Sequence, residues 1–164
     1  CFLPKLKRLI YIKVCHYLHL KFERYKMRKF IGLDVGDVRI GVAKCDPLGI
    51  LATALEVIDR NITDPIKRIE KILEEENTKT IIVGMPKSLD GSKKRQVEKV
   101  EEFVEQLKEN IEDLKVVYID ERYTTSEAEH YLRNYSKKNA KERRKVVDMV
   151  AATIILQNYL DMLK

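Results

Sequence analysis

The chain has 164 residues and a formal net charge of +6 at pH 7. That length is enough for one domain whose buried core needs neither disulfides nor a structural metal. Three scattered cysteines, Cys1, Cys15 and Cys45, form no CxxC pair. This pattern excludes a disulfide scaffold and a zinc finger, and it favours reduced thiols in a cytosolic protein.

The excess positive charge is confined to one end of the chain. Residues 1–26 hold seven of the 32 basic residues and one of the 26 acidic residues, so the remaining 27–164 carries no net charge. Composition therefore does not predict a general affinity for nucleic acid. Any such argument depends on where the charges of the domain lie.

The first 26 residues are apolar and basic, and the first methionine is Met27. Lysines interrupt every apolar run, so no stretch can span a bilayer or resemble the core of a signal peptide. We expect this segment to lie upstream of the true start, or to form a poorly packed basic extension of a domain at 27–164. The alternatives are a basic arm that contacts RNA or an anionic membrane, and an element packed on the domain.

The domain opens with three predicted strands. Residues 30–35 are almost entirely apolar, a tight turn follows at Gly36-Asp37-Val38, and 39–44 returns as a second strand. A third strand is expected at 50–58. Short turns between successive strands predict an antiparallel meander.

A helix is predicted after the meander. Asp64 suits the N-cap position and Pro65 the first helical position. The helical spacing of apolar residues predicts that one face packs inward, formed by Ile66, Ile69, Ile72 and Leu73.

The rest of the chain alternates strands and helices. Buried strands are predicted at 80–85 and 115–120, and helices at 93–109, 126–135 and about 141–163. The order of elements predicts an α/β fold with one mixed sheet, in which three antiparallel strands are followed by parallel strands. Helices are expected on both faces of that sheet.

Three acidic positions lie within these apolar segments. Asp34 is inside the first strand, Asp120 and Glu121 end the last strand, and Asp148 lies among valines and a methionine on the last helix. Each has a simple structural explanation when taken alone. Asp34 could cap a turn, and Asp148 could reach water from the edge of its helix.

An ion pair with Arg122 or Arg39 would likewise account for Glu121. Taken together, however, the acids indicate a shared role, because buried carboxylates repel one another and lose hydration unless cations lie between them. Hard divalent cations such as Mg²⁺ or Mn²⁺ prefer oxygen ligands. Two such ions about 3.5–4 Å apart can activate water and stabilise the leaving oxygen of a phosphodiester.

Four motifs in this order also resemble a known family: GLDVGDVRIGVA, IVGMPKSLDG, DERYTT and KVVDMVAATIILQ. The set resembles the YqgF/RuvX family, named as Holliday-junction resolvases and later associated with maturation of the 5′ end of pre-16S rRNA. The resemblance runs from Met27 to about Leu163. It implies an RNase H-like fold and a metal-dependent nuclease.

The same resemblance implies that Asp34, an acid of the DER motif and Asp148 bind the metal. Asp120 and Glu121 would point to opposite faces of a strand, so the sequence does not decide which of them reaches it. The resemblance favours Glu121 as the ligand. Asp120 remains a candidate catalytic residue.

Basic residues are expected to surround this site and contact phosphates. Arg39 follows the first turn and would contact a phosphate or pair with an acid. The other positions near the predicted strand ends are Lys93, Lys94, Arg95, Arg122, Lys141, Arg143, Arg144 and Lys145. Solvated helix faces are the simpler explanation for these runs of charge.

The resemblance thus implies a nuclease that processes the 5′ end of pre-16S rRNA, and we expect it in the cytoplasm as a monomer or a homodimer. A Holliday-junction resolvase acting on DNA is one alternative, and a non-catalytic rRNA-binding assembly factor is another. An ATPase of the actin, Hsp70 and sugar-kinase class would share the first motif. That class needs two facing domains, and one domain of this size has no second half.

Overall fold

The computed structural model describes residues 28–86, 91–120 and 140–164, with their side chains except at 91–93 and 140–143. The extension at 1–26 and the helix predicted at 126–135 lie outside these residues. No helix in the described part of the chain is long and apolar enough to cross a membrane.

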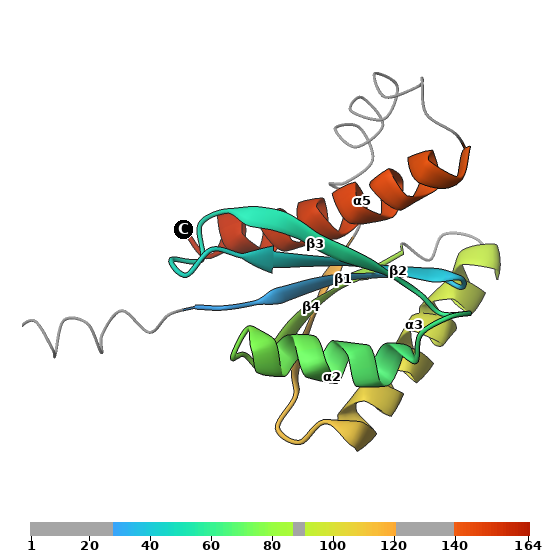
Figure 1. Ribbon diagram of the computed structural model, residues 1–164, viewed down its shortest axis with the longest axis horizontal. Coiled ribbons are helices and arrows are strands. Elements are labelled where there is room, and N and C mark those ends of the chain that lie inside the picture. The colour runs from blue at the N-terminus through green and yellow to red at the C-terminus, as the bar shows by residue number, and fades with distance from the viewer. Residues whose placement is uncertain (1–27, 87–90, 121–139) are drawn as a thin grey trace, which may run out of the picture.

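Five strands form one mixed sheet in the order β3-β2-β1-β4-β5 (Figure 1). β1, β2 and β3 pair antiparallel, and β4 and β5 continue the sheet in parallel with β1, as predicted. The bounds are β1 Ile31–Val35, β2 Arg39–Cys45, β3 Ala52–Asp59, β4 Thr80–Met85 and β5 Lys115–Asp120.

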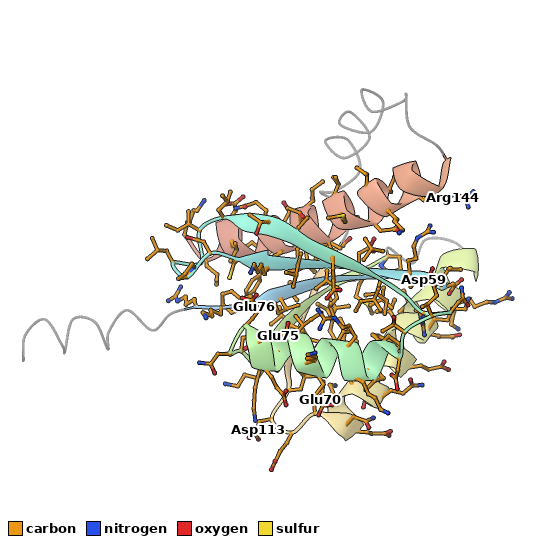
Figure 2. The ribbon with its side chains drawn as sticks, viewed as in Figure 1. Asp59, Glu70, Glu75, Glu76, Asp113 and Arg144 are labelled. Atoms are coloured by element: carbon orange, nitrogen blue, oxygen red, sulfur yellow. The ribbon has the colours of Figure 1, made fainter. Side chains whose placement is uncertain are left out.

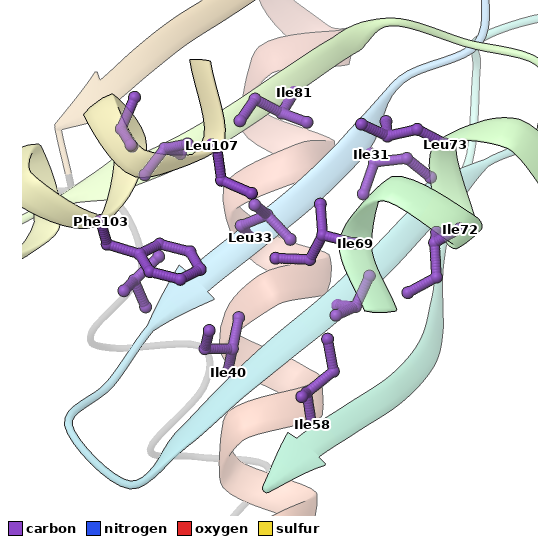
Figure 3. Close-up of a cluster of buried hydrophobic side chains, with 14 of the residues drawn as sticks. Ile31, Leu33, Ile40, Ile58, Ile69, Ile72, Leu73, Ile81, Phe103 and Leu107 are labelled. Atoms are coloured by element: carbon purple, nitrogen blue, oxygen red, sulfur yellow. The ribbon is translucent and has the colours of Figure 1, made fainter. Parts of the chain in front are cut away.

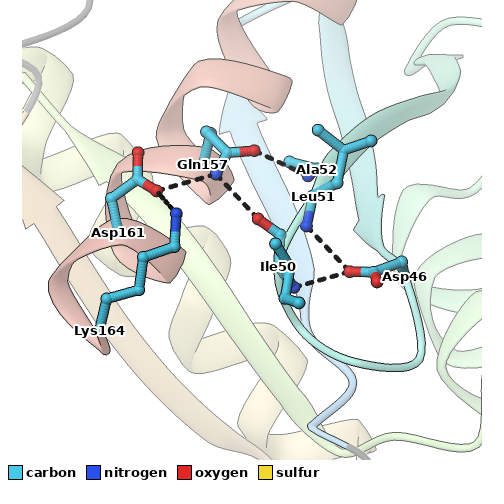
Figure 4. A network of polar contacts seen from close by, with 7 residues as sticks. All are labelled: Asp46, Ile50, Leu51, Ala52, Gln157, Asp161 and Lys164. Atoms are coloured by element: carbon cyan, nitrogen blue, oxygen red, sulfur yellow. Dashed lines mark hydrogen bonds and ion pairs between the residues drawn. The ribbon is translucent and has the colours of Figure 1, made fainter.

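β3 begins two residues later than predicted because Asp46 organises the turn before it. Its Oδ1 atom accepts hydrogen bonds from the backbone N–H groups of Ile50 (2.7 Å) and Leu51 (2.9 Å), as Figure 4 shows. These hydrogen bonds lower the pKa of the exposed Asp46 carboxyl. Gln157 ties the same turn to the last helix through the carbonyl of Ile50 and the N–H of Ala52.

Helices cover both faces of the sheet, which confirms the predicted α/β architecture (Figure 1). α2 (Pro65–Glu75) and α3 (Gly91–Asn110) lie on one face and α5 (Ala140–Met162) on the other. Asp64 caps α2 as predicted, since its side chain accepts from the N–H groups of Ile66 and Lys67.

Strand alternation divides the core into two clusters. In β1, Ile31 and Leu33 pack with α2 and α3 (Figure 3). Phe30 and Gly32 instead lie toward α5, because Phe30 packs on the α5 cluster and Gly32 is close to Leu156. The same alternation places Asp34 on the α5 face.

β5 is less buried than predicted. Only Ile119 is fully buried, while Lys115 and Tyr118 are exposed. The reason is its position, because β5 is the edge strand of the described sheet and pairs there with β4 alone.

Cys45 behaves as a small apolar residue of the α5 cluster. It is a buried free thiol, and its burial raises the pKa above the usual thiol value. The sulfur is also hydrogen-bonded to the backbone N–H of Phe30 (3.1 Å) and the carbonyl of Arg28 (3.3 Å). Cys1 and Cys15 lie outside the described residues.

α5 approaches the sheet closely at two glycines. A Cβ atom at Gly41 would collide with the carbonyl oxygen of Asp148, and one at Gly32 would lie 2.7 Å from the Cβ of Leu156 and 3.0 Å from the carbonyl oxygen of Ala152. Ala152 is itself fully buried against the sheet. Small residues on the sheet and the helix therefore fix the position of α5, and with it the position of Asp148.

We expect Gly41→Ala to lower the free energy of unfolding by about 1–3 kcal/mol, since its methyl group has no room under α5. Urea unfolding of the full chain measures this loss. Ala54→Val is the control, because it adds more bulk at an exposed position of β3 and should change stability by less than about 0.5 kcal/mol. An unchanged midpoint for Gly41→Ala would contradict the close approach.

Candidate functional site

Asp34 and Asp148 come together on the α5 face of the sheet. Asp34 lies opposite Gly41 in the β1–β2 pairing, and the missing side chain of Gly41 leaves room for the backbone of Asp148. Two acids more than 100 residues apart in the sequence thus lie on the same face of the sheet, both next to Gly41. Both are partly buried rather than fully exposed.

Arg39 joins this pair of acids as the neighbouring cation. Its Nε atom lies 2.7 Å from Oδ2 of Asp148, and the two side chains are 19% and 24% exposed. Arg39 shares the α5 face because it alternates in phase with Gly41 and Ala43 along β2. Of the two roles predicted for Arg39, the structure shows pairing with an acid.

Asp120 does not join them. It lies opposite Met85 in the β4–β5 pairing, and Met85 packs on the cluster under α2 and α3. The preceding residue, Ile119, packs toward α5. Strand alternation therefore places Asp120 on the other face of the sheet from Asp34 and Asp148. Glu121 and Arg122 lie outside the described residues.

Two carboxylates on one face suit a hard divalent cation in their chemistry, because both offer oxygen ligands. Within the described ranges, no group of three or more His, Cys, Asp or Glu side chains is arranged to hold a metal ion. Of the three predicted ligands, Asp34 and Asp148 lie in the described part of the chain and Glu121 does not.

The turn that follows Asp34 is closed by its own hydrogen bond and contacted by the side chains of Arg60 and Lys99. Gly36 and Arg39 close it through an N–H to carbonyl hydrogen bond of 2.9 Å. Arg60 donates from Nη1 to the Gly36 carbonyl (2.9 Å) and lies over the ring of Phe103, 5.1 Å from its centre. Lys99 of α3 contacts both carboxylate oxygens of Asp37 at 2.9 Å.

Sequence reasoning missed Arg60 and Lys99. Neither belongs to a motif, and both act by reaching a turn that lies far away in the sequence. The local pattern around them carries no signal for those contacts, which arise only when α3 and the β3–α2 connection fold against the hairpin. Arg60 fixes the backbone next to Asp34 through the Gly36 carbonyl, whereas the exposed ion pair of Lys99 adds little to the stability of the turn.

Basic side chains cluster at the same end of the molecule. Lys94 and Arg95 are exposed near the start of α3, and Arg144 and Lys145 are exposed near the start of α5. None of the four pairs with an acid in the part of the chain that the structure describes. The backbones of Lys93, Lys141 and Arg143 lie in the same helices, α3 and α5.

Several acids lie away from this end, although Asp34, Asp37, Asp59 and Asp148 lie near it. Figure 2 shows Arg144 and Asp59 at the hairpin end of the sheet, with Glu70, Glu75, Glu76 and Asp113 distant from Arg144. A hollow of about 640 Å³ near Asn77 has Glu70, Glu74 and Glu112 among its lining residues. Such a lining repels phosphates, so we expect nucleic acid at the hairpin end instead.

Comparisons with known proteins identify the family of the chain. A family model described as "RuvX: Holliday junction resolvase" matches residues 28–162, and the chain belongs to the RuvX family. A "Putative pre-16S rRNA nuclease" of Fusobacterium nucleatum is 53% identical over 138 residues, which cover 84% of this chain and all of the relative. A protein of the same name from Acetivibrio thermocellus is 44% identical over 135 residues, covering 81% of this chain and 95% of the relative.

Among solved structures, the fowlpox virus resolvase in complex with its substrate Holliday junction DNA has a similar fold. Its TM-score is 0.53 at 12% identity, and the match covers 83% of this chain and 99% of that chain. This likeness shows the fold alone. It confirms the predicted RNase H-like class, with a mixed sheet and helices on both faces.

We expect Arg60→Ala to lower the free energy of unfolding by about 1–2 kcal/mol, because it removes a hydrogen bond to the turn and a cation–π contact. Lys99→Ala is the matched control. It removes an exposed ion pair from the same turn and should cost less than about 0.5 kcal/mol. Urea unfolding measures both, and amide exchange at Asp37 and Val38 shows whether the turn loosens. Equal losses for the two variants would contradict the role given to Arg60.

Proposed function

We propose that the chain is a divalent-metal-dependent nuclease that processes the 5′ end of pre-16S rRNA. Family membership and the two nuclease relatives class the chain as a hydrolase of phosphodiester bonds. The observation that carries the proposal is the meeting of Asp34 and Asp148 across Gly41. Two partly buried carboxylates on one face offer the oxygen ligands that a hard divalent cation prefers.

Asp34, Glu121 and Asp148 are the proposed metal ligands, with Mg²⁺ or Mn²⁺ as the ion. The bound ion would activate a water molecule and stabilise the leaving oxygen. The position of Asp120 on the opposite face supports Glu121 as the third ligand, because successive strand residues point to opposite faces. Asp120 would then support the strand end instead of contacting the reacting phosphate.

The basic residues at the hairpin end would bind the nucleic-acid backbone. The candidates are Arg39, Lys93, Lys94, Arg95, Arg122, Lys141, Arg143, Arg144 and Lys145. Lys94, Arg95, Arg144 and Lys145 support this role best, because they are exposed and form no ion pair with another described residue. Contacts to phosphates fix the position of the substrate without reading its sequence. A domain without net charge would still attract RNA to this end.

A Holliday junction is the second candidate substrate, favoured by the description of the family model. A junction resolvase has to cut two strands symmetrically and would act as a homodimer, whereas an rRNA-processing enzyme can act as a monomer. The names of the relatives favour RNA. Processing of pre-rRNA would place the protein in the cytoplasm.

We expect the full chain to cut a pre-16S rRNA 5′ leader with Mn²⁺ or Mg²⁺ and to lose all cutting with EDTA. Asp34→Asn should lower the rate by on the order of 10³-fold or more, as for other catalytic groups that act as a unit. Asp161→Asn is the control, because Asp161 pairs with Lys164 at the other end of α5. Gel electrophoresis of labelled RNA, and of a labelled four-way DNA junction in parallel, measures the rates.

Cutting of the junction but not of the leader would favour the resolvase. If the leader is bound equally by the wild type and Asp34→Asn but cut by neither, the protein acts instead as an assembly factor on rRNA. Metal-independent cutting would contradict the role of the carboxylates.

The assignment of the third ligand is tested separately. We expect Glu121→Gln to weaken Mn²⁺ binding by about 10-fold or more and Asp120→Asn to change it by less than about threefold, because only the former removes a proposed ligand. Isothermal titration calorimetry of the two variants gives both affinities. The reverse order would assign the ligand to Asp120.

A further inference from the structure

Arg39 occupies the place where the proposed metal site needs positive charge. Its Nε atom contacts Oδ2 of Asp148 at 2.7 Å, directly beside the strand position of Asp34. A guanidinium and a divalent cation are thus counter-ions for the same carboxylate. When both cations lie beside Asp148, the positive charges of the guanidinium and the metal ion repel one another.

The ion pair is built into the fold. Arg39 begins β2, and its carbonyl accepts from Gly36 to close the hairpin turn. Gly41, two residues further on, gives α5 the room to bring Asp148 down onto the strand. At 19% and 24% exposure the pair is shielded enough to be stronger than an ordinary surface ion pair, but open enough for a ligand to reach it.

The guanidinium is not fully used by this contact. Among the described residues Arg39 makes one interaction, through Nε, and its two terminal nitrogens have no partner there. Those two nitrogens can donate side by side to two oxygens of a phosphate. The same side chain thus contacts a proposed metal ligand and has donor groups that could bind a backbone phosphate.

We propose that Arg39 is an exchangeable counter-ion of Asp148. It holds the carboxylate in the metal-free protein and turns its guanidinium to a backbone phosphate of the nucleic acid when the carboxylate serves the metal. This inference rests on the proposed function. It adds that Arg39 positions Asp148 before binding and the substrate after it.

Exchange predicts effects of opposite sign for Arg39→Gln. Mn²⁺ should bind roughly fivefold more tightly, because the guanidinium no longer competes for Asp148. The size of the effect follows from the free energy of one ion pair of this kind. RNA should bind more weakly, and the slope of log affinity against log salt should fall by about one, as for the loss of one phosphate contact. A merely structural role would not raise the affinity for the metal.

The experiment uses the full chain. Electron paramagnetic resonance of free Mn²⁺ gives the metal affinity without nucleic acid, and fluorescence anisotropy of a labelled pre-16S 5′ leader, recorded before cleavage, gives RNA affinity. Lys44→Gln is the matched control, since it removes the same charge and a 2.7 Å ion pair with Glu76 from the far end of the same strand. It should leave the Mn²⁺ affinity within about twofold of the wild type.

A further arm compares RNA binding with Mn²⁺ and with EDTA. Without metal, Arg39 stays paired with Asp148 and contributes little to RNA binding. Arg39→Gln should therefore weaken RNA binding more with Mn²⁺ than with EDTA. Arg39→Lys serves if the glutamine variant does not fold. It keeps the charge, so Mn²⁺ affinity should stay within about twofold, while the loss of the planar fork should still weaken RNA binding with Mn²⁺.

The outcomes separate this inference from the proposed function. If wild-type Mn²⁺ binding is lost in Asp34→Asn but is not tightened in Arg39→Gln, exchange is wrong and the metal site stands. If Arg39→Gln weakens RNA binding equally with Mn²⁺ and with EDTA, exchange is again wrong. If the wild type binds no Mn²⁺, the proposed function and the exchange both fail.

Discussion

The site depends on the close approach of α5 to the first two strands. Gly32 and Gly41 have no side chains, and Ala152 has only a methyl group, so the backbone of the helix rests on the sheet at this point. Interiors are packed so closely that even one methyl group there would displace the helix. This contact places Asp148 on the same face of the sheet as Asp34, so a shift of α5 would change how the two acids lie relative to one another.

Charge segregation follows from the same arrangement. Asp34 and Arg39 lie on the strands next to the hairpin turn, Asp148 faces them from α5, and exposed basic residues lie near the starts of α3 and α5. The acids of α3 lie along its outer face, where Glu98, Glu101, Glu102, Glu105 and Glu109 line a second hollow. A domain without net charge can therefore attract a polyanion to one end and repel it elsewhere, which suits a nuclease better than composition alone indicated.

The local elements could be predicted because their signals are local. The apolar runs at 80–85 and 115–120 gave the bounds of β4 and β5, and Asp64 with Pro65 marked the start of α2. The contact of Arg39 with Asp148 joins residues 109 positions apart. The sequence therefore left two roles open for Arg39, contact with a phosphate and pairing with an acid. Strand alternation likewise predicts that Asp120 and Glu121 point to opposite faces of the sheet, but it does not say which of the two points toward α5. The packing of Ile119 and Met85 places Asp120 on the face opposite α5, and Glu121 lies outside the described residues.

The central claim is that Asp34 and Asp148 share one divalent cation. Crystals of the full chain soaked in MnCl₂ and measured at the manganese absorption edge test it most directly, because anomalous scattering locates the metal without reference to activity. The account predicts a peak roughly 2.0–2.4 Å from carboxylate oxygens of both residues, the range of Mn²⁺ and similar hard cations with oxygen ligands. A peak bound by neither acid, or by acids of the α3 face alone, would contradict it.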